Sequence, residues 1–508
     1  MASRSLEKLR PVNDQEWRLS TPKARGARRG LAESTDPFLD QILASGRLKV
    51  VDRATLQSQP RRGAPTTAQL KMHAEPDAAY VLMVRHESGA ITYHFPAQVD
   101  RRSTARGPVT ATVRFVVPIP ETIEPTEAQR RVLVSKVLHA VVMKVVGKLI
   151  DKAIPIAGRL AEAAAWKLKG LEEGWKQVTL QALQSGSLPK TKIAETVGTK
   201  PGEHNLLFLH GTFSHASGAY SALATTRGSN GKTLFESLQP IYQNRIFAFD
   251  HFTVSRSLVE NAQALLDALP NQPCLFDVVT HSRGGLVLRT LVENTSALKS
   301  ASRFSLASAV LVASPNDGAP LASPSTFDKY ITWISNLIDL FPDNPFTVAA
   351  HFIADALSWL ARAVRVDLSG LAAMNSEGSV IHQLQGPPGP PLGAYSALVS
   401  NYTATSGLLQ RMVDAGVDAF FKMANDLVVP TEGGWRIDPG TTPLIAGNLI
   451  GCYGQGGNLA DPPDGQVTHI SFFNRTETVD FLSRALLGQP QGLPVLDPAT
   501  HLPVGPIA

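Results

Sequence analysis

The chain has 508 residues, which is too long for one ordinary domain, so we expect two or more. Hydrophobic residues make up 43% and charged residues 18%, which excludes a largely disordered chain. The net charge is +5, but residues 1–30 hold eight Lys and Arg against three acids, so the remainder is balanced. We therefore expect no nucleic-acid partner, and we favour a solvated basic tail over a tail that contacts lipid or nucleic acid.

The two cysteines, Cys274 and Cys452, are too few for a disulfide scaffold, which fits a reducing compartment. The N-terminal residues lack the apolar core of a signal peptide, and no run of 18 uncharged apolar residues predicts a membrane-spanning helix. We therefore expect a cytoplasmic protein.

Residues 1–70 are polar and interrupted by prolines, and they predict a basic, partly disordered segment. Residues 71–122 predict a small β-rich module. In it, a hairpin is expected over 80–95, around Glu87-Ser88-Gly89, and a further strand over 110–120.

Residues 123–200 predict a long helical region followed by a linker. Apolar residues recur at helical spacing between 137 and 150, with lysines in one stripe at four-residue intervals, and Pro155 is expected to kink or end this helix. We favour packing of this basic amphipathic helix on a neighbouring element over contact with a membrane surface.

From residue 201 onwards, short apolar runs alternate with helical patterns such as 257–269, which is typical of βαβ units and a mostly parallel sheet. A Pro-rich tail is expected over 489–508. The apolar runs cover residues 206–211, 245–250, 274–279, 308–314 and 395–401.

The run over 274–279 ends in Thr280-His281-Ser282-Arg283-Gly284-Gly285, and a helical pattern begins at once. A strand that turns directly into a helix places the turn residue, Ser282, in strained geometry above the sheet edge. The segment resembles the G-x-S-x-G nucleophile elbow of the α/β-hydrolase superfamily, in its lipase/esterase-like branch, although Thr280 replaces the first glycine. The alternative interpretation is a serine N-cap beside a Gly-rich turn.

A serine nucleophile needs a base and an acid, which follow it in the order Ser, acid, His in this superfamily. The segment VTHISFF resembles the end of lipase domains and implies His469 as the base; His501, in the Pro-rich tail, is a poor candidate. The segment NDLVVP implies Asp426 as the acid. Asp317, in the lipase-like stretch ASPNDGAPLA, is the alternative acid.

The oxyanion donors are expected before the elbow. The residues His210-Gly211-Thr212-Phe213 follow an apolar run and resemble the oxyanion loop of lipases and esterases. The resemblance implies the backbone N–H groups of Thr212, with Phe213 as the alternative, and of Arg283 as donors. It gives His210, Gly211 and Gly284 supporting roles, with His210 bracing the loop.

Residues 322–384 contain two amphipathic stretches rich in Trp, Phe, Ile and Leu, which predict a helical lid; a packed helical insertion without gating is the alternative. The resemblance covers residues 201–488. It implies the α/β-hydrolase fold, preceded here by the β-rich module and the long helical region.

The activity implied is that of a serine hydrolase that cleaves carboxylic esters of lipid or other apolar acyl groups, without metal or cofactor. An acyltransferase on the same fold and a non-catalytic hydrolase-like scaffold are the alternatives. The expected partners are a small-molecule or lipid ester and a peripheral membrane contact. We expect removal of residues 1–120 to affect location or regulation more than chemistry.

Overall fold

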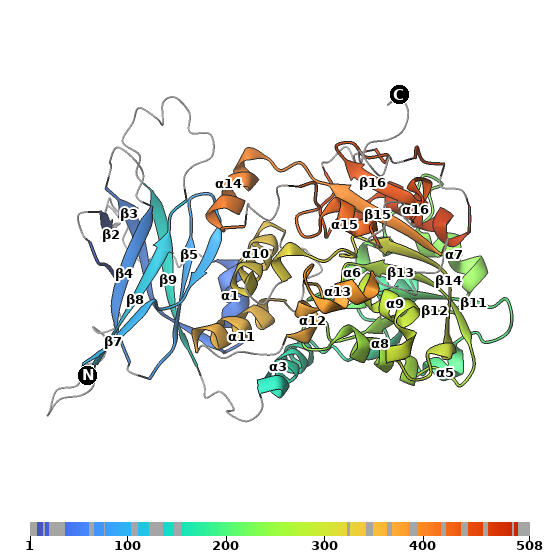
Figure 1. Cartoon of the computed structure of the whole chain (residues 1–508), viewed down its shortest axis with the longest axis horizontal. Helices are drawn as coiled ribbons and strands as arrows, with labels where there is room; N and C mark the ends of the chain where they lie inside the picture. Colours follow the sequence, from blue (N-terminus) through green and yellow to red (C-terminus); the bar gives the residue numbers. More distant parts are fainter. Residues whose placement is uncertain are drawn as a thin grey trace.

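The structure is a computed structural model with two units, a β-sandwich and an α/β unit, joined by helices that lie between them (Figure 1). It describes residues 8–13, 16–19, 36–59, 66–75, 77–102, 110–120, 136–146, 154–322, 326–341, 349–362, 368–385, 394–417, 423–437, 445–460, 466–489 and 492–495. Most of the predicted C-terminal tail, including His501, lies outside these ranges.

The α/β unit is built on a seven-stranded sheet in which six strands are parallel to one another and the edge strand β10 is antiparallel to its neighbour β12. Central strands such as β12 are buried at every residue, because helices cover both faces, and this explains their uniformly apolar sequences. The predicted mostly parallel sheet is confirmed. Its order is β10 (Gly174–Gln177), β12 (Ile246–Asp250), β11 (His204–Leu209), β13 (Cys274–His281), β14 (Phe304–Val312), β15 (Tyr395–Asn401) and β16 (Ile450–Gly454).

Helices such as α7, α8, α9 and α16 flank this sheet and shorter ones lie in its connections, whereas α3 and α14 lie towards the sandwich (Figure 1). The predicted helix over 257–269 is α8, which begins with a capping box between Ser257 and Glu260. The helices are α3 (Ile154–Leu168), α4 (Leu180–Gln184), α5 (Ile193–Thr196), α6 (Ala216–Ala219), α7 (Leu234–Tyr242), α8 (Leu258–Asp267), α9 (Gly284–Glu293), α14 (Ser406–Asp414), α15 (Thr431–Trp435) and α16 (Thr476–Leu486).

The N-terminal unit is a sandwich of two antiparallel sheets, called here sheet A and sheet B, whose inner faces form a separate apolar cluster. The hairpin predicted over 80–95 is β5 and β6, and the strand predicted over 110–120 is β8. Sheet A has the order β1 (Arg10–Pro11), β4 (Thr67–Ala74), β8 (Thr110–Pro118) and β7 (Gln98–Arg102). Sheet B has the order β2 (Trp17–Leu19), β3 (Leu48–Ser58), β9 (Val137–Val145), β5 (Tyr80–Arg85) and β6 (Ile91–His94).

The helix predicted from residue 137 is wrong, because this segment is strand β9, paired with β3 and β5. Most of β9 is buried on both faces, so its sequence lacks the apolar–polar alternation of a half-buried strand and resembles a helix face. The helix further on is α3, and Pro155 stands near its start, where proline is tolerated, and does not end it. Residues 121–135 and 147–153 lie outside the described residues.

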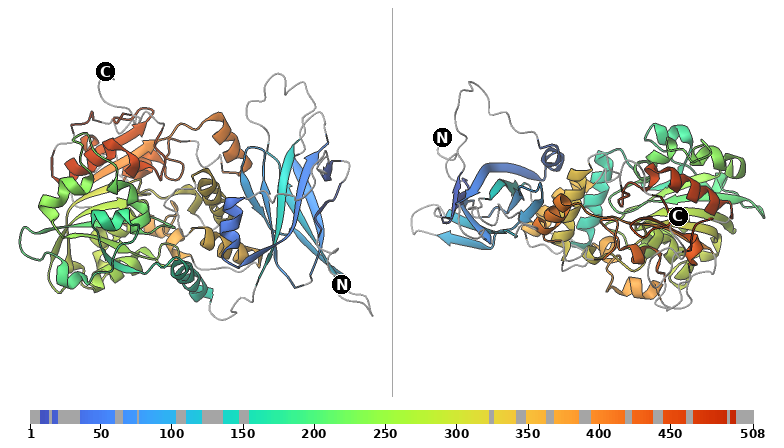
Figure 2. Two further views of the ribbon diagram at one scale, coloured as in Figure 1. Left: turned by 180° about the vertical axis from the view of Figure 1, so that it is seen from behind. Right: turned by 90° about the horizontal axis from the view of Figure 1, so that it is seen from above.

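The outer face of sheet B packs on helices α1 (Pro37–Leu43), α10 (Phe327–Leu340) and α11 (Ala349–Ala361) (Figures 1 and 2). Val81 and Met83 of β5 belong to the same buried apolar cluster as the α/β sheet. The two units therefore share one core. The predicted insertion over 322–384 is helical in its described parts, which also include α12 (Ser369–Ala372) and α13 (Ser379–Leu384).

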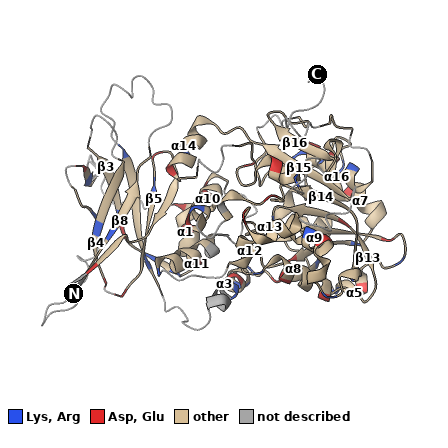
Figure 3. Cartoon of the chain, viewed as in Figure 1, with Lys and Arg blue, Asp and Glu red and all other residues tan. Residues whose placement is uncertain are grey.

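Basic and acidic residues are interspersed over both units, in keeping with the balanced charge outside the N-terminal segment (Figure 3). Among the described residues, no helix combines the length and the apolar character needed to cross a bilayer.

Candidate active site

Ser282 stands in a sharp turn between a buried strand and a helix. Strand β13 ends at His281 and helix α9 begins at Gly284, and Ser282 between them has a φ of 53°, in the left-handed region that non-glycine residues rarely adopt. Its backbone N–H donates to the carbonyl of Val312 on the neighbouring strand, at 2.9 Å. The strained turn aims the Ser282 side chain above the carboxyl end of the sheet.

Two glycines make this turn possible. A Cβ on Gly284 would lie 2.1 Å from the carbonyl oxygen of Leu209, and a Cβ on Gly285 would lie 2.1 Å from Oγ of Ser314. The usual elbow sequence has glycine where this chain has Thr280. The threonine side chain is accommodated here because its hydroxyl lies 3.2 Å from that of Ser314, next to the space that the missing side chain of Gly285 leaves. Gly285 thus relieves the crowding next to Thr280.

The loop after β11 lies directly against Ser282. Strands β11 and β13 are parallel neighbours with Leu209 opposite Thr280. The chain leaves β11 towards β12 but leaves β13 towards β14, in opposite directions along the sheet, and α/β proteins form crevices at such a point. A Cβ on Gly211 would lie 2.6 Å from Cβ of Ser282, so only glycine allows this approach.

The two expected oxyanion donors have backbone N–H groups without a hydrogen-bond partner among the described residues, namely those of Thr212 and Arg283. The alternative donor is already engaged, since the N–H of Phe213 donates to Oγ1 of Thr253 at 3.1 Å. The geometry thus favours Thr212 over Phe213.

His469 and Asp426 form a buried pair. The Nδ1 atom of His469 lies 2.8 Å from Oδ2 of Asp426, and because a carboxylate only accepts, Nδ1 carries the proton. The other carboxylate oxygen accepts the N–H groups of Val428 and Val429, and the N–H of His469 donates to the Asp426 carbonyl at 2.8 Å. The neutral ring then has Nε2 free to accept a proton.

Asp317, the alternative acid, has other partners. Its Oδ1 accepts from the side-chain amide of Gln385 at 2.6 Å, and its backbone N–H donates to Gly433. The structure therefore places Asp426, and not Asp317, beside His469.

His281, the residue before Ser282, contacts His469, which the sequence reasoning did not anticipate. Its Nε2 donates to the backbone carbonyl of His469 at 2.8 Å, and the two rings lie 5.0 Å apart. This contact brings His469 next to the residue preceding Ser282. Within the described part of the chain, no hydrogen bond joins the Ser282 hydroxyl to His469, and these residues are only 6% and 2% exposed. The site is closed.

His210 is a bracing residue in this geometry. Its Nε2 accepts the N–H of His251 at 3.2 Å, so its Nδ1 carries the proton and donates to the Gly211 carbonyl. Burial holds the pKa of His210 well below its usual value, and the ring stacks on that of His251. A neutral ring tied to Gly211 can fix the loop but is not placed to transfer protons.

The side chain of Arg283 runs away from the turn into the core. Its Nε donates to the Gly370 carbonyl and its Nη2 to the Arg256 carbonyl, at 3.0 and 2.6 Å, and Nη1 has no partner among the described residues. Burial lowers its pKa to about 10, against the attraction of Glu162, so it stays charged at neutral pH. The guanidinium therefore ties α12 to the loop after β12.

Helix α10 contacts the loop of Gly211 and the loop of Asp426. Tyr330 packs against Phe213 with ring centroids 6.1 Å apart, and Nε1 of Trp333 donates to the carbonyl of Leu427, next to Asp426, at 2.7 Å. From the following segment, Met374 accepts a hydrogen bond from the Thr212 hydroxyl. These residues cover the closed site.

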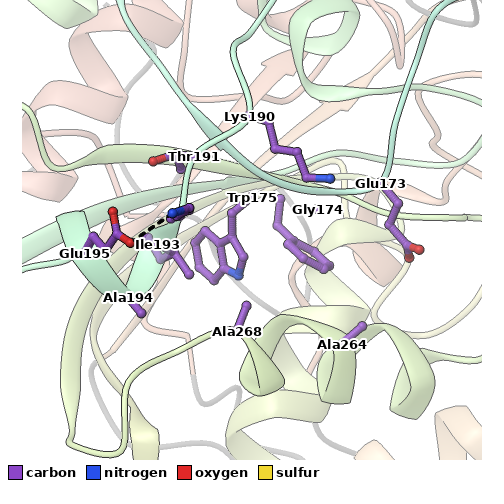
Figure 4. A pocket seen from close by; sticks show the side chains of 12 residues that line it. Glu173, Gly174, Trp175, Lys190, Thr191, Ile193, Ala194, Glu195, Ala264 and Ala268 are labelled. Atoms are coloured by element: carbon purple, nitrogen blue, oxygen red, sulfur yellow. Dashed lines mark hydrogen bonds and ion pairs between the residues drawn. The ribbon is translucent and has the colours of Figure 1, made fainter.

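A pocket of about 430 Å³ lies elsewhere, at the β10 edge of the sheet between α5 and α8 (Figure 4). Trp175 and Ile193 lie among its apolar lining residues, and none of its lining residues belongs to the Ser282 site. Among the residues that the structure describes, no three His, Cys, Asp or Glu side chains are grouped to hold a metal ion.

More than half of the chain, residues 173–487, matches a family described as a domain of unknown function, DUF7379. The chain belongs to the DUF7379 family. No curated protein matches it. Ser282, Asp426 and His469 all lie within the DUF7379 domain, whereas the sandwich and α3 precede it.

Solved structures of two lipases show a weak likeness to the chain. One is the mature lipase BlEst2 of Bacillus licheniformis, with 13% identity and a TM-score of 0.24 over 48% of this chain and 85% of that one. The other is lipase 1 of Pelosinus fermentans, with 12% identity and a TM-score of 0.33 over 56% and 98%. At these TM-scores neither likeness bears on function, which must be argued from the site.

Buried histidines make the stability of the fold sensitive to acid. Burial lowers the pKa of His94, His251 and His281 to about 3 and that of His215 to about 4. The unfolded chain, with histidine pKa values near 6.5, binds more protons, so stability present above pH 6.5 is lost as the pH falls towards 3. Asp250, whose pKa burial raises to about 6, offsets part of this loss between pH 6 and 4.

We expect the free energy of unfolding, measured by urea denaturation, to fall by several kcal/mol between pH 7.5 and 5. The contribution is on the order of 2 kcal/mol for each fully buried histidine. An unfolding midpoint that does not move over this range would contradict the assignment of neutral, buried rings.

Proposed function

We propose that the chain is a serine hydrolase that cleaves carboxylic esters. The observation that carries the proposal is that three features lie together at the carboxyl end of β13. Ser282 has a left-handed backbone conformation there, and the Gly211 loop lies against it. The His469–Asp426 pair is bound to His281, the residue before Ser282. A serine N-cap would need none of these neighbours.

In the proposed mechanism, Oγ of Ser282 attacks the ester carbonyl, and Nε2 of His469 takes its proton and then gives it to the leaving alcohol. Asp426 holds the ring with Nδ1 protonated and stabilises the imidazolium. The N–H groups of Thr212 and Arg283 stabilise the oxyanion, each by on the order of 3 kcal/mol in the transition state. Water then cleaves the acyl-enzyme by the same steps in reverse.

The substrate class follows from the cover over the site. The loop of Gly211 contacts buried apolar side chains, since Tyr330 packs on Phe213 and Met374 contacts the Thr212 hydroxyl, so we propose an ester with an apolar acyl group. Because Ser282 and His469 are almost completely buried, admission of this ester requires displacement of the covering segment, which is the lid role proposed for α10–α12. Hydrolysis of p-nitrophenyl esters of increasing chain length tests this class.

Two matched variants test whether Asp426 or Asp317 is the acid that holds His469. Replacing Asp426 with asparagine is expected to lower kcat by roughly 10⁴-fold, because the amide favours the wrong tautomer of His469. Replacing Asp317 with asparagine is expected to leave kcat nearly unchanged, because its partner is Gln385. Steady-state kinetics on p-nitrophenyl butyrate separates the two. A large loss in D317N together with an active D426N would reverse the assignment.

A further inference from the structure

A buried carboxylate from α3, which precedes the DUF7379 domain, enters the loop after β12. Glu162 accepts the backbone N–H groups of three consecutive residues, Thr253, Val254 and Ser255, at 2.6, 3.0 and 2.8 Å. It also accepts the hydroxyls of Thr253 and Ser255, at 3.3 and 2.6 Å. Bonds to an ionised acceptor are about twice as strong as neutral ones, so five of them in a buried setting fix this loop.

The loop holds the first oxyanion donor. Because the Thr253 hydroxyl gives its proton to Glu162, its lone pairs face the N–H of Phe213, which donates to it at 3.1 Å. Phe213 has a φ of 58°, a left-handed conformation that needs outside support. This bond fixes the peptide that follows Thr212 and hence the direction of the Thr212 backbone.

The same loop holds the second donor. The carbonyl of Arg256 accepts a hydrogen bond from the Arg283 guanidinium. A second connection runs through Gly370, whose carbonyl also accepts from that guanidinium and whose N–H donates to the carbonyl of Val254. A Cβ on Gly370 would lie 2.3 Å from the Thr253 carbonyl oxygen, so this contact is tight. Both residues expected to bind the oxyanion are thus anchored to residues 253–256.

We propose that Glu162 is a positioning residue for the oxyanion hole. Its carboxylate orders the loop 253–256, and the loop sets the backbone of Thr212 on one side and the side chain of Arg283 on the other. The negative charge of Glu162 also attracts the buried Arg283 guanidinium and raises its pKa against the effect of burial. The inference rests on the proposed ester hydrolysis and assigns a role to α3.

The test uses two variants of the full chain. In Glu162→Gln an NH2 group replaces one carboxylate oxygen, and it cannot accept the hydrogen bonds that the backbone N–H groups of the loop donate to that oxygen. In Thr253→Val the acceptor for Phe213 is lost without a change in charge. Both are expected to lower kcat for p-nitrophenyl butyrate about tenfold or more with KM nearly unchanged, less than the roughly 100- to 1000-fold cost of removing an oxyanion donor. Thr253→Ser, which keeps the hydroxyl, is expected to restore most of the loss.

Glu236→Gln is the matched control, since Glu236 also accepts a backbone N–H, that of Thr233, in the capping box at the start of α7. It is expected to leave kcat unchanged. A second measurement is specific to stabilisation of the oxyanion. It is the rate on an ester divided by the rate on its thionoester, in which sulfur replaces the carbonyl oxygen. This ratio is expected to fall in E162Q and T253V, whereas a purely structural defect would slow both substrates equally.

The outcomes separate this inference from the proposed function. If wild type is labelled at Ser282 by a fluorophosphonate, but folded E162Q and T253V keep the wild-type kcat and rate ratio, the positioning role is overturned and the hydrolase proposal stands. If wild type has no turnover and no label, both are overturned. Should E162Q fail to fold, the comparison of T253V with T253S decides.

Discussion

Replacing Ser282 with alanine is expected to lower kcat for p-nitrophenyl butyrate by about 10⁶-fold, to little more than the contribution of binding and oxyanion stabilisation. The oxygen removed is the one that forms the acyl bond. The variant should fold normally, because the Ser282 side chain makes no hydrogen bond among the described residues and its backbone bond to Val312 does not involve the side chain. Steady-state kinetics and thermal denaturation measure the two effects separately.

Ser221→Ala is a suitable control for this prediction. Ser221 is exposed, and its hydroxyl donates to the carbonyl of Gly218, away from the elbow. Its loss is expected to leave kcat at the wild-type value. Turnover that persists in folded S282A would show that another group is the nucleophile and would remove the basis of the proposed mechanism.

Removing residues 1–153, which include the β-sandwich, is expected to abolish cooperative folding of the remaining chain together with its turnover. The expectation from sequence, made for removal of residues 1–120, was an effect on location or regulation, and the shared core argues against it. Four buried side chains of the outer face of sheet B, Val81, Met83, Val141 and Met143, represent roughly 6–12 kcal/mol at about 1.5–3 kcal/mol each. That is comparable with the whole stability of a typical domain, about 5–15 kcal/mol.

Polar contacts across the same interface strengthen this expectation. The side chain of Asn336 in α10 accepts from the N–H of Ile91 and donates to its carbonyl, both at 2.9 Å, and Asp339 pairs with Arg85 and Arg411. Without the sandwich these groups on α10 lose partners, and α10 is the helix that holds the Asp426 loop through Trp333.

The deletion is measured by circular dichroism, urea denaturation and ester hydrolysis of the fragment 154–508. Arg85→Ala in the full chain is a milder companion, expected to lower stability while leaving most of the turnover. A soluble fragment 154–508 with a sharp unfolding transition and the turnover of the full chain would show that the two units are independent.

Local sequence patterns were sufficient to predict those elements of the fold that depend on residues close together in the sequence. The apolar runs of the parallel sheet are buried on both faces, and the change from strand to helix around Ser282 is visible in eight or so residues. The order implied by the resemblance predicted His469 and Asp426 as a pair, although nothing local in the sequence shows the contact between their side chains.

The remainder depended on contacts between distant residues. Strand β9 resembled a helix because its second face, with Val141, Met143 and Val145, is buried in the core that the sandwich shares with segments much later in the chain. The sandwich strands before residue 70 are short or partly exposed, so composition alone suggested disorder. The contacts of Glu162 and His281 could not be predicted, because both side chains bind backbone groups of distant segments. Glu162 accepts backbone N–H groups of residues 253–255, and His281 donates to the carbonyl of His469.

The central claim is that Ser282 is an activated nucleophile. Its most direct test is mass spectrometry of the full chain after treatment with a fluorophosphonate, with and without a mild detergent that displaces the apolar cover. We expect one adduct, on Ser282, that forms faster with detergent, is absent from S282A and is strongly reduced in H469A. Folded wild-type protein that acquires no adduct under either condition would contradict the claim and leave the hydrolase-like scaffold as the better description.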